Sequence, residues 1–123
     1  MDFSEAIKSG FANYVTFSGR ATRSEFWYWV LFVVLGAFAT AILDAAMFSH
    51  WAPLTSAFEL LTVLPSLAVS VRRLHDTDSS GWWLLIGIVP LIGVILLIVL
   101  YCRPGTPGDN FYGPDRLKEL GAR

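Results

Sequence analysis

The chain has 123 residues, of which 54% are hydrophobic and only 15% are charged, whereas a soluble domain carries about 25% charged residues. Long windows contain no charge at all, so the polar surface is too small to cover a water-soluble fold of this size. These proportions exclude a disordered tail, a nucleic-acid binder and a soluble enzyme of ordinary type. The composition predicts one small membrane domain over residues 1–123, with nine Lys and Arg against ten Asp and Glu.

The first predicted element is an amphipathic helix over residues 3–17. Phe3, Ile7, Phe11 and Tyr14 recur there at helical spacing, and polar side chains occupy the other faces. Such a helix lies in the membrane interface or packs against its own membrane domain, and the pattern fits both arrangements.

Three apolar segments follow, and they predict spans at about 26–48, 54–71 and 82–102. A helix rises about 1.5 Å per residue, so roughly 20 residues cross a hydrocarbon core of about 30 Å. Backbone polar groups have to be satisfied within lipid, which favours helices in all three segments. The predicted fold is therefore all-α and polytopic, with three transmembrane helices, the N-terminal amphipathic helix and a tail over 103–123.

The third segment allows a second interpretation, because Pro90 and Gly93 interrupt it. Three full spans place the tail on the opposite side from the loop at Arg72, and the basic residues then divide five against four between the two sides. A re-entrant hairpin at Pro90 would instead place all nine on one side. In both cases the positive-inside rule predicts a cytoplasmic N-terminus and a cytoplasmic loop at Arg72.

The densest polar cluster is the run RRLHD at 72–76, where the second segment ends. Two guanidinium groups at a helix C-terminus complement its dipole and can bind phosphate oxygens in a forked geometry. Arg20 and Arg23 are expected on the same side of the membrane. The cluster is therefore either a site for anionic headgroups or a salt-bridged loop that fixes the second span to the first.

Asp44 and Glu59 form a second candidate pair, because both carboxylates lie within apolar segments. The turn between the first two helices centres near Trp51, so an antiparallel hairpin places the two carboxylates at similar depth. Ionisable groups inside spans are candidates for function, here a proton or cation relay. The alternative interpretation is that both carboxylates reach water at the membrane surface near His50.

Few other residues suggest catalysis or metal binding. The single Cys102 excludes a disulfide within the chain and a multi-cysteine metal site. No serine is identifiably paired with His75 as a nucleophile. The sequence therefore predicts no metal, no cofactor and no nucleic-acid partner, and it favours a non-enzymatic protein.

Four motifs in a fixed order resemble a known family. They are FSGRATRSEFW at 17–27, RRLHDT at 72–77, GWW at 81–83 and PGTPGDN at 104–110. The chain resembles the YhaH-type family of small bacterial inner-membrane proteins, a domain of unknown function numbered 805. The resemblance implies a bacterial inner-membrane location and a multi-helix fold, with no established activity.

The polar signature of that family falls on ten residues of this chain, which are Gly19, Arg20, Arg23, Glu25, Arg72, Arg73, His75, Asp76, Gly108 and Asn110. The chain departs from the family pattern at two places. Asp78 and Ser79 stand where members often have Gly-Arg, and Phe111 stands where many have Arg. Both departures remove positive charge and weaken the case for a phosphate clamp.

Three functional hypotheses follow from these features. The first is a binding or organising protein whose arginine-rich cytoplasmic interface contacts anionic lipids, a membrane-protein partner or a second copy of the chain. The second is a small cation or proton transporter, or a channel subunit, that uses Asp44 and Glu59. The third is a lipid-headgroup enzyme in which His75 and Asp76 act as acid–base groups.

Overall fold

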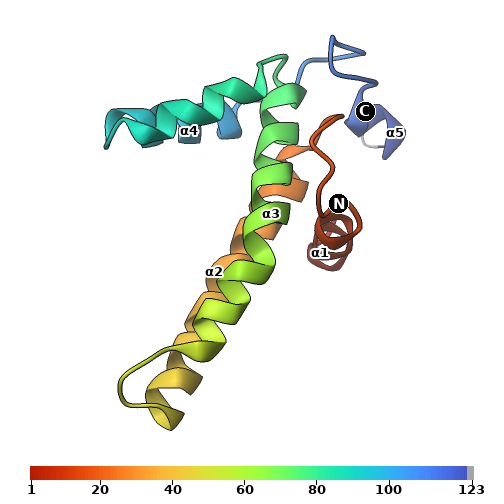
Figure 1. The fold of residues 1–123 in the computed structure, drawn as a ribbon. Coiled ribbons are helices and arrows are strands. Elements are labelled where there is room, and N and C mark those ends of the chain that lie inside the picture. Colours follow the sequence, from red (N-terminus) through yellow and green to blue (C-terminus); the bar gives the residue numbers. More distant parts are fainter. Residues whose placement is uncertain (122–123) are drawn as a thin grey trace.

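Two long antiparallel helices form the framework of the computed structural model, which describes residues 1–121 (Figure 1). Helix α2 covers Arg23–Met47 and helix α3 covers Pro53–Asp76. Their 25 and 24 residues correspond to lengths of about 37 and 36 Å, which exceed a hydrocarbon core of about 30 Å. The first two predicted segments are thus helical, except for Phe48 at the end of the first.

Both long helices present apolar side chains to the outside. In the most apolar part of each helix, only 6% of residues in α2 and 22% in α3 are buried. The core helix of a soluble protein would be mostly buried, so these two helices have the surface that lipid requires. Both are long and apolar enough to cross a membrane.

Helix α2 begins at Arg23 because Thr22 caps it. The Thr22 hydroxyl accepts a hydrogen bond from the Glu25 backbone N–H at 3.2 Å, which satisfies one of the donors left free at a helix N-terminus. The Glu25 side chain does not complete a capping box and instead bonds to Arg72 and Ser9. The cap therefore leaves the Glu25 carboxylate available for contacts with other helices.

The structure corrects the expectation of one continuous helix over 82–102. A 3₁₀ helix, η1, covers Gly81–Ile88, and helix α4 covers Ile92–Cys102. Pro90 and Leu91, whose φ is 64°, separate them. The two elements fold back on each other and project sideways from the end of α3 (Figure 1). At about 2.0 and 1.5 Å per residue, each is roughly 16 Å long, which is too short to span a bilayer.

Gly93 permits the close contact inside this hairpin. A Cβ at this position would lie 1.8 Å from the Ile86 carbonyl oxygen, so no larger residue fits without a backbone shift. The sequence therefore specifies the break twice, first through Pro90 at the bend and then through Gly93 just after it. The alternative interpretation of this segment, a hairpin around Pro90, describes the backbone that is found.

The N-terminal helix is shorter than the predicted range 3–17. Helix α1 covers Phe3–Ala12, with Asp2 accepting a hydrogen bond from the Glu5 N–H at 2.8 Å. It ends where the Asn13 side chain donates to the Ser9 carbonyl oxygen at 2.9 Å, a local bond that competes with helix continuation. Helix α1 packs against α2, with Gly10 in contact with the Trp29 ring.

The core lies where α1, α2, α3 and α4 meet, at the end of the hairpin opposite the 48–52 turn. Its buried members are Ala21, Phe26, Trp29, Val69, Leu74, Leu97 and Tyr101. The tail after Arg103 returns over the end of α3 and ends in the short helix α5, Arg116–Glu119 (Figure 1). The N-terminal loop, the end of α3 and the tail therefore meet at one end of the molecule.

Candidate functional site

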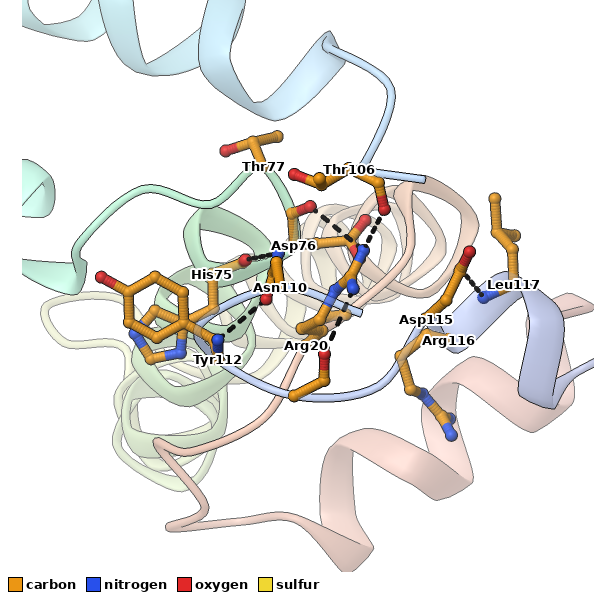
Figure 2. Close-up of polar contacts among 12 residues, drawn as sticks. Arg20, His75, Asp76, Thr77, Thr106, Asn110, Tyr112, Asp115, Arg116 and Leu117 are labelled. Atoms are coloured by element: carbon orange, nitrogen blue, oxygen red, sulfur yellow. Dashed lines mark hydrogen bonds and ion pairs between the residues drawn. The ribbon is translucent and has the colours of Figure 1, made fainter. Parts of the chain in front are cut away.

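Asp76 is the centre of a buried polar cluster at this end of the molecule. Its carboxylate accepts from Arg20 Nε at 2.9 Å and from Arg73 Nη1 at 2.7 Å, and the residue is only 3% exposed. Its backbone carbonyl accepts from the Thr106 N–H at 2.7 Å. Asp76 therefore joins the loop before α2, the end of α3 and the tail (Figure 2).

Arg20 binds the tail as well as Asp76. Its Nη2 donates to the Thr106 carbonyl oxygen at 2.6 Å, and its Nη1 donates to the Gly108 carbonyl oxygen at 2.7 Å and to that of Gly113 at 3.4 Å. Backbone carbonyls thus receive most of its donors (Figure 2). The Arg20 guanidinium is buried and is fully occupied by contacts within the chain.

Arg73 has a similar role on the other side of Asp76. Its Nε donates to the Tyr101 carbonyl oxygen at 3.0 Å, and its Nη2 donates to the carbonyl oxygen of Arg103. Its Nη1 also approaches the Ala21 carbonyl oxygen at 3.4 Å. Arg73 is 0% exposed, so it fixes the end of α4 and has no surface for an external ligand.

Arg72 forms a separate ion pair with Glu25. Its Nη1 donates to Glu25 Oε2 at 2.6 Å, and the Ser9 hydroxyl donates to the same oxygen at 3.0 Å. Both charged side chains are buried. Together with Ser9, this pair links three helices of the core, because Ser9 belongs to α1, Glu25 to α2 and Arg72 to α3.

His75 and Asp76 do not form an acid–base pair. The His75 Nδ1 lies 3.0 Å from the Gly19 carbonyl oxygen, and since a carbonyl only accepts, Nδ1 carries the proton. The His75 ring stacks on Tyr112 with centroids 4.0 Å apart, while the Asp76 carboxylate is bound by the two arginines. His75 therefore holds the loop and the tail in place.

The remaining two residues of the predicted cluster differ in exposure. Asn110 donates to the His75 carbonyl oxygen at 2.9 Å and accepts from the Tyr112 N–H at 2.8 Å (Figure 2). Arg23 is exposed, and its Nη1 donates to the Cys102 carbonyl oxygen at 3.3 Å. Of the four arginines in the predicted cluster, Arg23 alone is therefore accessible.

Asp44 and Glu59 have different surroundings and no contact between them among the described residues. Asp44 is buried, and its carboxylate accepts from the backbone N–H groups of Leu54 and Thr55 and from the Thr55 hydroxyl, at 3.1, 2.9 and 2.8 Å. It therefore caps the first turn of α3. Glu59 is exposed one turn further along α3.

Several participants of the cluster were not predicted from the sequence. They are Ser9, Thr106, Tyr112, Gly113, Asp115 and Arg116. Asp115 could have been found in the sequence, because aspartate is a favoured N-cap residue and it precedes the short helix α5, which it caps. The tail carbonyls had none, since every residue type carries a backbone carbonyl.

The arrangement is a rigid polar junction, and it carries no obvious reactive group. Within residues 1–121, no three His, Cys, Asp or Glu side chains come together as a possible metal site. Two guanidinium groups share one buried carboxylate. Their charge-assisted hydrogen bonds hold the loop before α2, the end of α3 and the tail together, away from water.

Comparison with known proteins identifies a family whose matched region includes most of this junction. The family model described as "Protein of unknown function (DUF805)" matches residues 14–114, which include Arg20, the run 72–76 and the tail to Gly113. No solved structure matches the chain.

Three relatives from Escherichia coli K12 are similar over most of their length. The inner membrane proteins YhaH and YhaI are each 44% identical, over 84% of this chain and 88% and 87% of their own chains. The uncharacterized protein YiiR is 33% identical over 81% of this chain and 85% of its own. The chain belongs to the DUF805 family.

Proposed function

We propose that the chain is a non-enzymatic protein of the bacterial inner membrane that binds anionic lipid headgroups at its cytoplasmic surface. Relatives named as inner membrane proteins support the location. Two outward-facing apolar helices support a multi-pass fold in which α2 and α3 cross the bilayer. The observation that carries the proposal is the exposed Arg23, which lines an aromatic groove and donates to the carbonyl of Cys102, the residue before the exposed Arg103.

The distribution of charge supports the orientation. Residues 24–71 and 74–102 contain no Lys or Arg, so basic residues are confined to the N-terminal region, the end of α3 and the tail. The fold brings these three regions to one end, since the tail bonds to Arg20 and Asp76. By the positive-inside rule this end faces the cytoplasm. The η1–α4 hairpin then enters the bilayer from the same side without crossing it.

The lipid-binding surface combines a groove and a charged rim. The groove has a volume of about 390 Å³ and is lined by Arg23, Ser24, Trp27, Tyr28 and Leu31. Arg103 follows the Cys102 carbonyl to which Arg23 donates. Aromatic side chains favour the membrane interface, and arginine binds phosphate in a forked geometry. A phosphodiester at the rim and an acyl chain along the groove fit this arrangement.

Lipid binding is tested with purified protein in detergent, by native mass spectrometry after titration with phosphatidylglycerol or phosphatidylcholine. We expect the wild type to retain phosphatidylglycerol and the double variant Arg23→Gln/Arg103→Gln to lose most of it. Lys8→Gln/Lys118→Gln is the matched control, because both lysines are exposed and the charge change is identical. Equal loss in both double variants, or no preference of the wild type for phosphatidylglycerol, overturns the proposed surface.

Topology is tested separately by cysteine labelling in intact cells, in a Cys102→Ser background. Phe111→Cys reports on the tail and Trp51→Cys on the opposite end, since these side chains are 89% and 67% exposed. We expect an impermeant maleimide to label position 51 and to label position 111 only after permeabilisation. Labelling of both positions from outside overturns the two-span topology.

A further inference from the structure

We propose that a second pocket binds a small phosphate-bearing anion through Arg72 and Arg116. The pocket has a volume of about 310 Å³ and lies between α1, the loop before α2 and α5. Ser9, Asn13, Ser18 and Arg20 also line it. None of these residues belongs to the Arg23 groove, so the pocket is distinct from the lipid surface proposed above.

Arg72 provides the main reason to expect an anion. Its side chain is 5% exposed, and only its Nη1 has a partner, Glu25. Its Nε and Nη2 are buried and have no hydrogen-bond partner among the described residues. A buried guanidinium with unpaired N–H groups is unfavourable unless an acceptor is supplied. Arg73, in contrast, uses all three of its nitrogens.

Arg116 supplies a second cation with loose internal contacts. Its Nη2 is 4.0 Å from Glu25 Oε1, and its Nη1 is 3.3 Å from Glu119 Oε2. Glu25 Oε1 is itself buried without a hydrogen-bond partner. The Arg116 side chain is 27% exposed and leads away from the Arg20–Asp76 contacts (Figure 2). It is therefore able to turn toward a ligand at low cost.

The hydrogen-bond donors of the pocket that are unpaired within residues 1–121 favour an anion over a cation. Four guanidinium groups meet in this region, those of Arg20, Arg72, Arg73 and Arg116, and they contact three carboxylates, those of Glu25, Asp76 and Glu119. Asp115, next to Arg116, adds a fourth carboxylate, which is buried, so the charges balance, and it is the N–H groups of Arg72 left unpaired in the described part of the chain that favour an anion. The Ser18 hydroxyl and the Asn13 amide on the pocket wall add neutral polar groups.

The size of the pocket limits the ligand. Ligand pockets commonly have volumes of roughly 300–1,000 Å³, so a pocket of about 310 Å³ suits a small molecule. Arginine pairs recognise phosphate through parallel N–H···O bonds. The chemistry selects a phosphate monoester or inorganic phosphate, supplied either in solution or as the headgroup of a lipid.

The test is isothermal titration calorimetry of full-length protein in detergent with inorganic phosphate and with glycerol 3-phosphate. We expect Arg116→Gln to weaken binding by about tenfold or more, since it removes a charge-assisted contact. Lys118→Gln is the matched control, because Lys118 is exposed on the same short helix and does not line the pocket. We expect it to bind like the wild type, as we do for the lipid-surface variant Arg23→Gln/Arg103→Gln.

Two results overturn the proposal. One is the absence of binding heat for both ligands with wild-type protein. The other is an equal loss of affinity in Arg116→Gln and Lys118→Gln, which would indicate unspecific attraction to charge. Thermal unfolding without ligand shows that each variant is folded. Repeating the titration in phosphatidylcholine nanodiscs with and without phosphatidic acid distinguishes the ligand sources, because this lipid carries a phosphate monoester. Competition by phosphatidic acid identifies a headgroup, and undiminished binding identifies a soluble phosphate.

Discussion

Substitution of Asp76 by Asn is expected to destabilise the protein strongly. The carboxylate is the shared counter-ion of Arg20 and Arg73, which are 4% and 0% exposed, so water cannot take its place. An amide of the same shape removes the negative charge and directs an NH₂ donor toward at least one guanidinium. Removing one partner of a buried ion pair costs about 3–5 kcal/mol. We expect a loss in this range for Asp76→Asn.

The loss is measured by unfolding in mild detergent, followed by tryptophan fluorescence, together with limited trypsin digestion. The tail should detach first, because it is bound through Arg20 and the Asp76 backbone, so cleavage after Arg116 and Lys118 should become faster. Asp78→Asn is the matched control, since Asp78 is exposed and has the same charge, and surface changes are usually within about 0.5 kcal/mol. If Asp76→Asn is as stable as Asp78→Asn, the cluster does not hold the tail.

Three further substitutions test other parts of the fold. Gly105→Ala places a Cβ 2.1 Å from Asp76 Oδ2, so we expect a loss of about 1–3 kcal/mol and faster tryptic release of the tail. Gly93→Ala places a Cβ against the Ile86 carbonyl oxygen and should open the η1–α4 hairpin. We expect the tryptophan emission maximum of the variant to differ from that of the wild type. Asp44→Ala removes the cap of α3 and should cost about 0.5–2 kcal/mol in the same unfolding assay, whereas an unchanged stability would show that this carboxylate does not stabilise α3.

The sequence predicted the two long helices well because their signals are local. An uncharged run of 18 residues, Phe26 to Leu43, together with Thr22 as a cap, defines α2 without reference to the rest of the chain. The run Trp82 to Cys102 passes the same length test. Pro90 and Gly93 mark a possible break in the sequence, but hydropathy does not decide between a kinked span and a hairpin. The close approach of Gly93 to the Ile86 carbonyl decides it, and this contact depends on the path of the backbone.

The sequence predicted that the arginines lie at one end of the hairpin, but it did not predict the bonds that they form or the other residues of the cluster. The arginines were expected together because they are drawn to one membrane surface, and the structure does bring Arg20, Arg72 and Arg73 to one end of the hairpin. Their burial was not foreseeable, since it depends on tail carbonyls such as those of Thr106 and Gly108. Chains offer a carbonyl at every residue, so no pattern of side chains marks the ones that are used.

The junction has a consequence for the order in which the protein is completed during synthesis. Arg20 bonds to carbonyls 86 and 88 residues later in the chain, and domains form from the N-terminus as translation proceeds. Both long helices therefore exist before the segment that binds Arg20 has left the ribosome. A chain that stopped after Arg103 would leave Arg20 without the carbonyls of Thr106 and Gly108, so the last residues to be made complete the fold of the first.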